Sequence, residues 1–176
     1  MSRSMYYSSV LGLDIGMFYK RRNYSIVVNG RNPIEAHEYL GQDLHGKDAV
    51  VVDDMISSGE SMLDVCKQLK EKGAERVFCF ATFGLFTDGC DKFDQAFKEG
   101  IIDKVFCTNL VYRRPELKNK PWFVEVNMCK YVAYLIDTLN NDATISTLLN
   151  PVKRIQTLMD KHRNELANQI KIEFEE

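Results

Sequence analysis

The sequence of 176 residues has none of the marks of a membrane, secreted or nucleic-acid-binding protein. No stretch approaches the roughly 18 consecutive apolar residues of a membrane span, and no signal peptide opens the chain. Lys and Arg total 23 and Asp and Glu total 25, so the formal net charge is only −2. Such a balance gives no general attraction to nucleic acid or to acidic membranes. We therefore expect a soluble, cytoplasmic protein without a nucleic-acid or membrane partner.

Cysteine and histidine are also too sparse and scattered to form a framework. The five cysteines include no CxxC pair, which argues against both a disulfide scaffold and a zinc knuckle. His37, His45 and His162 are isolated, so no direct metal site is expected. Hydrophobic residues make up 45% of the chain, enough for a sizeable core.

Two short hydrophobic runs indicate the fold. Ala49–Val52 lacks alternation and predicts a strand buried on both faces, and Val77–Ala81 predicts a second strand. Apolar residues between them recur at helical spacing, and Gly73 supplies a helix stop. Strand, helix and strand within this length predict a βαβ unit with parallel strands.

The alternation of strands and helices continues on both sides of this unit. Further strands are predicted at Leu13–Tyr19, Val105–Cys107 and Trp122–Val126, with helices near residues 3–11, 93–97 and 131–139. The predicted class is α/β, with a mainly parallel sheet flanked by helices.

The last part of the chain predicts a long helix. Asn150 and Pro151 suit its start, and a narrow apolar stripe follows from Val152 to Leu166. We expect residues 1–142 to form the main domain and residues 143–176 a C-terminal helical extension. The stripe fits a helix packed on its own domain and a subunit contact about equally well.

The segment Asp53–Ser61, between the first predicted strand and helix, carries the chemistry. Ligands bind at the carboxyl ends of parallel strands, where this segment lies. Ser57, Ser58 and Ser61 offer hydroxyls, and Gly59 permits a tight bend. The N–H groups and positive dipole end of the following helix complete a cradle for a phosphate.

Asp53 and Asp54 call for a different ligand, because carboxylates repel a phosphate. Two adjacent acceptor groups suit vicinal hydroxyls, or a magnesium ion bound through water. Ribose 5-phosphate carries both a phosphate and a diol. The competing interpretation is that the serines only cap the helix, with Ser61 and Asp64 forming a capping box. Placing two acids after a buried strand without a ligand is costly, which favours the functional interpretation.

Val51–Gly59 resembles the phosphoribosyl pyrophosphate signature shared by type I phosphoribosyltransferases and ribose-phosphate pyrophosphokinases. The resemblance implies a ribose-phosphate site formed by Asp53, Asp54, Ser57, Ser58, Gly59, Glu60 and Ser61. The acids would hold the ribose hydroxyls and the serine segment the 5-phosphate. Glu60 departs from the family, which has a small residue there, and we expect its side chain to point to solvent.

Two further segments favour the pyrophosphokinases. Lys20-Arg21-Arg22 resembles their Lys-Arg-Arg run, which implies that Lys20 and Arg22 stabilise the transferred diphosphoryl group, at the start of a flexible loop that contains Arg31. Ala81–Phe86 resembles an Ala-Thr-His-Gly segment with Phe83 in place of histidine, and Thr108-Asn109 resembles a Thr-Asn pair. The chain is thus similar to the C-terminal half of these enzymes.

The resemblance implies synthesis of phosphoribosyl pyrophosphate and AMP from ribose 5-phosphate and ATP, with Mg²⁺ as cofactor and a homo-oligomeric assembly. A Pro-Asp-x-Gly-Gly loop and the N-terminal half, with most of the ATP site, do not occur in the sequence. We expect a truncated protein that starts at an internal methionine, binds ribose 5-phosphate weakly and has little or no activity alone.

Two alternatives remain open. A phosphoribosyltransferase that joins a base to phosphoribosyl pyrophosphate would use the same loop, although no base-binding hood is recognisable. A catalytically silent homologue that binds partners or senses nucleotides would accommodate Glu60, Phe83 and the C-terminal helix.

Overall fold

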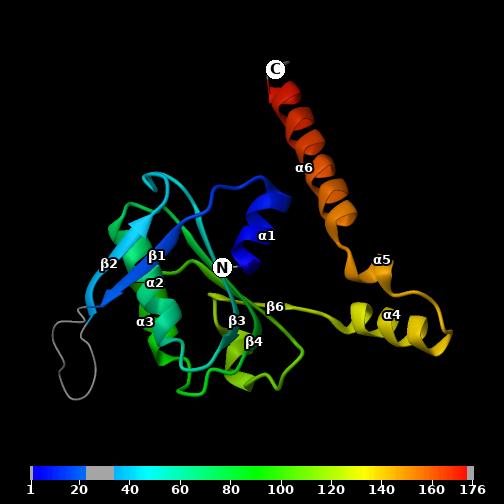
Figure 1. The fold of residues 1–176 in the computed structure, drawn as a ribbon, viewed down its shortest axis with the longest axis horizontal. Coiled ribbons are helices and arrows are strands. Elements are labelled where there is room, and N and C mark those ends of the chain that lie inside the picture. Colours follow the sequence, from blue (N-terminus) through cyan, green and yellow to red (C-terminus); the bar gives the residue numbers. More distant parts are fainter. Residues whose placement is uncertain (1, 23–33, 174–176) are drawn as a thin grey trace. The chain divides into compact units, whose positions relative to one another are not determined.

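Four parallel strands form the main sheet of the structure, a computed structural model that describes residues 2–22 and 34–173 (Figure 1). These strands are β3 (Ala49–Ile56), β4 (Val77–Gly84), β5 (Lys104–Thr108) and β6 (Phe123–Val126). They lie side by side in chain order, and every neighbouring pair is parallel. The predicted α/β class with a parallel sheet is confirmed.

Two amphipathic helices, α2 (Glu60–Glu71) and α3 (Asp91–Lys98), pack on one face of this sheet. Their buried side chains are Met62, Leu63, Cys66, Leu69, Phe93 and Ala96. Alternate residues of β4 enter the same core, namely Val77, Cys79 and Ala81. Crossovers between parallel strands share one hand, so strands that follow each other in chain order place their helices on the same face.

The first strand of the sheet, β3, differs from its prediction. It continues beyond Val52 to Ile56, and its Val50 side chain is 52% exposed. Phe80 of β4 is 36% exposed. The prediction of a strand buried on both faces is wrong, because α2 and α3 cover only the face to which alternate residues point.

A two-stranded antiparallel sheet precedes the main one. It pairs β1 (Met17–Arg22) with β2 (Ile34–Leu40), and Lys20 lies opposite His37. The predicted strand Leu13–Tyr19 therefore starts too early and stops short of the basic run, and β2 was not predicted. Apolar periodicity does not reveal these strands, because β1 ends in Lys20-Arg21-Arg22 and β2 carries Glu35, His37 and Glu38 among its apolar residues.

Contacts divide the chain into two units. Residues 15–129 form one and hold both sheets, whereas residues 1–14 and 130–176 form the other. The second unit holds α1 (Ser2–Leu11), most of α4 (Cys129–Asn140), α5 (Ser146–Leu149) and α6 (Val152–Glu173). Because α4 groups with the later helices, the units are not delimited at residue 142, and the predicted domain boundary stays a prediction.

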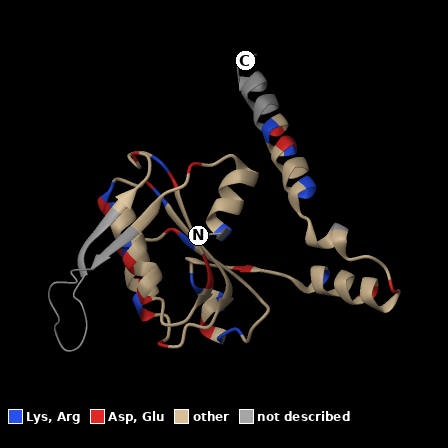
Figure 2. Cartoon of the chain, viewed as in Figure 1, with Lys and Arg blue, Asp and Glu red and all other residues tan. Residues whose placement is uncertain are grey.

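The start of α6 agrees with its sequence signal. The backbone N–H of Val152 donates a hydrogen bond to Asn150 Oδ1 at 3.2 Å, so Asn150 caps the helix. Figure 2 shows Lys and Arg interspersed with Asp and Glu among the described residues of α2, α3 and α6. In the described part of the chain, no helix combines the length and apolarity that crossing a bilayer requires.

The core of the sheet unit is built around a buried indole. Trp122 is fully buried and stacks on Phe93, with ring centroids 5.3 Å apart. Its N–H donates to Asp94 Oδ1 at 2.7 Å, and Lys120 donates to Asp94 Oδ2 at 2.5 Å. Partial burial acts to raise the pKa of the Asp94 carboxyl, but the hydrogen bonds from Lys120 and Trp122 outweigh it, and the pKa lies below its ordinary value.

This carboxyl gives a pH-dependent prediction. Because the native-state pKa of Asp94 is depressed, its stabilisation is present above the ordinary value of 3.8 and is lost as pH falls through the native-state pKa. We expect Asp94→Asn to lower the free energy of unfolding by about 1–2 kcal/mol at pH 7. The difference from the unsubstituted protein should shrink below about pH 4.

The measurement is urea unfolding followed by fluorescence of Trp122, the single tryptophan of the chain. Asp160→Asn is the control, because that carboxylate forms an exposed pair with Arg163 at 3.6 Å and should change stability little. Equal stability of Asp94→Asn and the unsubstituted protein at pH 7 would contradict the role given to Asp94.

Candidate functional site

The serine bend, residues Ser57–Ser61, joins the carboxyl end of β3 to α2. Gly59 is the N-cap of the helix, with the left-handed φ of 85°, and its carbonyl accepts the first helical bond from Leu63 at 2.9 Å. The first N–H groups of an α-helix have no acceptor within the helix. The bend therefore presents backbone donors and serine hydroxyls together at the positive end of a helix dipole.

The core fixes the position of this bend. A Cβ atom on Gly59 would lie 2.3 Å from Cε2 of Phe93, so the backbone of the bend rests directly on that ring. Phe93 is fully buried and also meets Phe86 edge-on, with centroids 5.1 Å apart. Gly59 is therefore required both for its backbone conformation and for its lack of a side chain.

The segment that follows β4 holds the other side of the bend. The N–H of Leu85 donates to the carbonyl of Ile56 at 2.9 Å, and the N–H of Thr87 donates to the carbonyl of Ser57 at 3.0 Å. These bonds satisfy backbone acceptors at the start of the bend. The backbone there is thus anchored from β3, from the core and from the neighbouring strand.

The capping-box interpretation is not supported. The cap of α2 is Gly59, and no side chain caps the helix by a hydrogen bond. The polar groups of Ser61 and Asp64 therefore do not form the reciprocal pair that this interpretation needs. The serine hydroxyls of the bend can therefore bind a ligand. Ser58 Oγ, for example, accepts only a long hydrogen bond of 3.5 Å from the N–H of Glu60.

The two acids lie inside β3 rather than directly after it, because the strand continues to Ile56. Both Asp53 and Asp54 are exposed. The N–H of Asp54 donates to Asp53 Oδ1 at 2.8 Å, which orients the first carboxylate against the backbone. Exposed carboxylates that lead into the bend can accept hydrogen bonds from hydroxyl groups of a ligand.

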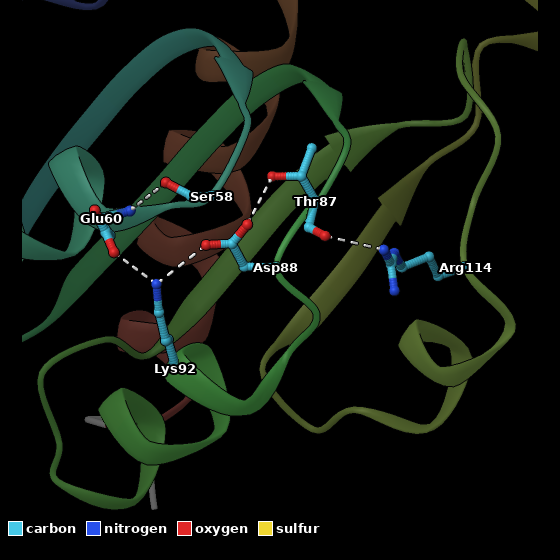
Figure 3. A network of polar contacts seen from close by, with 6 residues as sticks. All are labelled: Ser58, Glu60, Thr87, Asp88, Lys92 and Arg114. Carbon is cyan, nitrogen blue, oxygen red and sulfur yellow. Dashed lines mark hydrogen bonds and ion pairs between the residues drawn. The ribbon is translucent and has the colours of Figure 1, made fainter.

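Glu60, where the sequence departs from the family pattern, is exposed as expected and has an ion-pair partner that was not predicted. Its Oε1 lies 2.6 Å from Lys92 Nζ, and Lys92 also reaches Asp88 Oδ2 at 3.2 Å (Figure 3). Hydrogen bonds to Glu60 and Asp88 raise the pKa of Lys92 above its ordinary value. No local sequence signal joins Glu60 to Lys92, because these residues belong to successive strand–helix units.

The network extends to the neighbouring loop. Thr87 Oγ1 donates to Asp88 Oδ1 at 3.2 Å, and the Thr87 carbonyl accepts a bond from Arg114 at 3.2 Å (Figure 3). The segment Leu85–Asp88 therefore has two roles. Its backbone anchors the serine bend, and its Asp88 side chain pairs with Lys92.

The predicted catalytic residues Lys20 and Arg22 lie in β1, whereas the sequence analysis placed them after the strand. Their side chains and residues 23–33, including Arg31, lie outside the described residues. Their proposed role therefore stays a prediction.

The other segments of the family resemblance connect strands. Thr108 Oγ1 donates to the carbonyl of Thr82 at 2.6 Å, which ties β5 to β4. Asn109 Oδ1 accepts a bond from the N–H of Met128 at 2.8 Å. Phe83 is half-buried in β4, opposite Met55 of β3. These contacts give the three residues structural roles at the carboxyl edge of the sheet.

Two hollows lie near the serine bend without enclosing it. A groove of about 430 Å³ runs between α2 and α3, and Glu60 and Lys92 are among its lining residues. A second hollow of about 550 Å³ is lined by Leu85, Thr87, Tyr112, Arg114, Pro115 and Glu116. Ser57, Ser58 and Ser61 line neither hollow, and Ser57 and Ser61 are exposed whereas Ser58 is half-buried.

Comparison with known proteins places these features in a family context. Residues 26–150 match the family described as phosphoribosyl synthetase-associated domain. A ribose-phosphate pyrophosphokinase of Vibrio cholerae is 30% identical over 138 residues, which are 78% of this chain and 41% of that protein. One from Ureaplasma parvum is 34% identical over 116 residues, covering 65% of this chain and 33% of that protein.

A solved structure has the same fold. The crystal structure of phosphoribosylpyrophosphate synthetase from Mycobacterium smegmatis matches 81% of this chain and 42% of that chain, with a TM-score of 0.62 and 20% sequence identity. The chain thus spans between a third and about two fifths of the length of these proteins.

The contact between Gly59 and Phe93 gives the prediction from this site. Gly59→Ala adds a Cβ that must displace the Phe93 ring, and it also places alanine at a left-handed φ. Gly100→Ala is the matched control, because its φ is +69° and nothing lies within 4 Å of an added Cβ. Both variants carry a conformational cost of about 1–2 kcal/mol.

In Gly59→Ala, we expect displacement of the Phe93 ring to lower the free energy of unfolding by roughly a further 1–3 kcal/mol. Urea unfolding of the two variants measures the difference. Equal losses in the two variants would show that the Phe93 ring does not restrain the bend.

Proposed function

This chain belongs to the phosphoribosyl synthetase-associated domain family, and from that membership we propose that it forms the ribose 5-phosphate-binding part of a ribose-phosphate pyrophosphokinase. The observation that carries the proposal is the serine bend, with its left-handed Gly59, hydroxyls and helix N–H groups at the carboxyl end of β3. The 5-phosphate would accept hydrogen bonds from these donors, and the helix dipole would favour its negative charge.

The acids of β3 would hold the other end of the sugar. Asp53 and Asp54 are exposed and accept but do not donate hydrogen bonds when ionised. They would bind the vicinal hydroxyls of ribose and so fix the direction of O1 relative to the phosphate. With its phosphate bound by the serine bend and its hydroxyls bound by the two carboxylates, the sugar could bind in only one orientation.

In the proposed reaction, O1 of ribose 5-phosphate attacks the β-phosphorus of ATP. The bond from that phosphorus to the oxygen bridging to the α-phosphate breaks, so AMP leaves, and the O1 proton is released to solvent. Catalysis would come from positioning and from stabilisation of phosphoryl charge rather than from a covalent intermediate. Lys20 and Arg22 would supply that positive charge.

Magnesium fits this site only in an indirect way. Among residues 2–22 and 34–173, no three His, Cys, Asp or Glu side chains are grouped so that they would hold a metal ion. Mg²⁺ keeps several waters and binds phosphate oxygens, so Asp53 and Asp54 would reach it through water. When bound with ATP, it would neutralise charge on the phosphoryl oxygens.

The 176 residues of this chain would bind ribose 5-phosphate without catalysing the reaction. The matched relatives are nearly twice as long as this chain, which resembles their C-terminal half, so we propose that this stretch binds the sugar phosphate without transferring a diphosphoryl group by itself. Assembly into homo-oligomers stays a prediction.

The proposal predicts selective binding of ribose 5-phosphate. Calorimetry with Mg²⁺ should give a Kd on the order of 1 mM. Binding of 2-deoxyribose 5-phosphate should be about tenfold weaker, because one hydroxyl is missing from the pair that the carboxylates accept. In Asp53→Asn and Asp54→Asn, ribose 5-phosphate should also bind about tenfold more weakly, and the difference between the two sugars should shrink.

Asp64→Asn is the matched control, because Asp64 is an exposed carboxylate near the start of α2, the helix that follows the serine bend. Removing a negative charge near a dianion strengthens binding in general, so weakening specific to Asp53 and Asp54 distinguishes hydroxyl contacts from electrostatics. No heat with ribose 5-phosphate would overturn the proposal. Formation of AMP from ATP and ribose 5-phosphate by the chain alone would overturn only the statement that it does not transfer the diphosphoryl group.

A further inference from the structure

Glu60 raises an electrostatic problem for the proposed phosphate site. It is the first residue of α2, and its backbone N–H lies in the serine bend, where it donates a long bond of 3.5 Å to Ser58 Oγ. Its carboxylate is therefore tethered within one side-chain length of the position where a phosphate would sit. A unit negative charge at that distance repels a dianion, and the repulsion is felt even in a solvent-exposed site.

Lys92, in the neighbouring strand–helix unit, pairs with the Glu60 carboxylate and offsets its charge. Its ammonium lies 2.6 Å from Glu60 Oε1 and 3.2 Å from Asp88 Oδ2, so it bridges a carboxylate at the start of α2 and one in the loop before α3. Figure 3 shows Lys92 reaching from α3 to the Glu60 carboxylate, which it meets away from Ser58. The Glu60 side chain is 66% exposed, and Glu60 is one of the residues that line the groove between α2 and α3.

We infer that Lys92 is a positioning residue of the phosphate site, which holds and neutralises the Glu60 carboxylate so that the serine bend stays open to an anion. The inference rests on the proposed function, since it concerns the same phosphate. It gives Glu60 and Lys92 a joint role: the lysine acts on the ligand through the glutamate and does not contact it.

The alternative role for Lys92 is direct attraction of the phosphate. The two roles differ in one observable. If Lys92 acts through Glu60, removal of the glutamate charge makes Lys92 dispensable. If Lys92 attracts the phosphate directly, its removal weakens binding whether or not Glu60 is charged.

The test is a double-mutant cycle in the full chain, with ribose 5-phosphate and inorganic phosphate as titrants in calorimetry. Lys92→Met should raise the Kd for both about three- to tenfold, because the freed carboxylate repels both anions. Glu60→Gln removes the repelling carboxylate and should lower the Kd for both anions. The double variant Lys92→Met/Glu60→Gln should bind like Glu60→Gln.

Two further measurements separate this role from a structural one. Lys67→Met is the matched control, because Lys67 is an exposed lysine of α2 that lines the same groove. Its removal should change the Kd by less than the removal of Lys92. The effect of Lys92→Met should also largely disappear at about 1 M salt, where the Debye length is about 3 Å.

The outcomes are separable. If the unsubstituted chain binds ribose 5-phosphate and the double variant binds as weakly as Lys92→Met, Lys92 contacts the anion directly and the inference is overturned. It is also overturned if Lys92→Met binds like the unsubstituted chain. If the unsubstituted chain binds neither ribose 5-phosphate nor phosphate, the proposed function fails and this inference fails with it.

Discussion

The close approach of the Gly59 backbone to the Phe93 ring is the constraint on which the site depends. No Cβ fits between them, so the serine bend lies directly against a side chain that is itself fully buried. Phe93 packs against Phe86 and Trp122, and Trp122 is held by Asp94. The geometry of the bend is therefore set by fully buried aromatic residues of the core, which is how a site at the surface can be preorganised.

The strand order explains why the parts of the site meet. In a parallel sheet built in chain order, the loop after each strand opens at the same edge. The serine bend, the segment after β4 and the start of α3 thus become neighbours, and Lys92 can reach Glu60 although 32 positions separate them in sequence. In the proposed phosphate site, this ion pair would compensate the negative charge that Glu60 brings next to the anion.

The sequence predicted those strands and helices in which the spacing of apolar residues matches the pattern of buried residues. β4, β5, β6, α2 and α3 were expected because their apolar residues face one common core. The pairing of β1 with β2 was not predicted, because charged residues in both strands interrupt the apolar alternation that would reveal them. The serine bend was expected from its residues, whereas its support by Phe93 and its electrostatic link to Lys92 are long-range contacts without a local signature.

If the serine bend holds the phosphate of a sugar phosphate, as we propose, the anion must change the chemical environment of the backbone amides there. In a ¹⁵N-labelled sample titrated with ribose 5-phosphate, we expect the largest chemical-shift changes at the backbone amides of Ser58–Ser61, because these N–H groups would bond to the anion. Ribose without phosphate should leave these amides unchanged. Shift changes confined to the hollow around Tyr112 and Arg114, with the serine bend unaffected, would contradict the account.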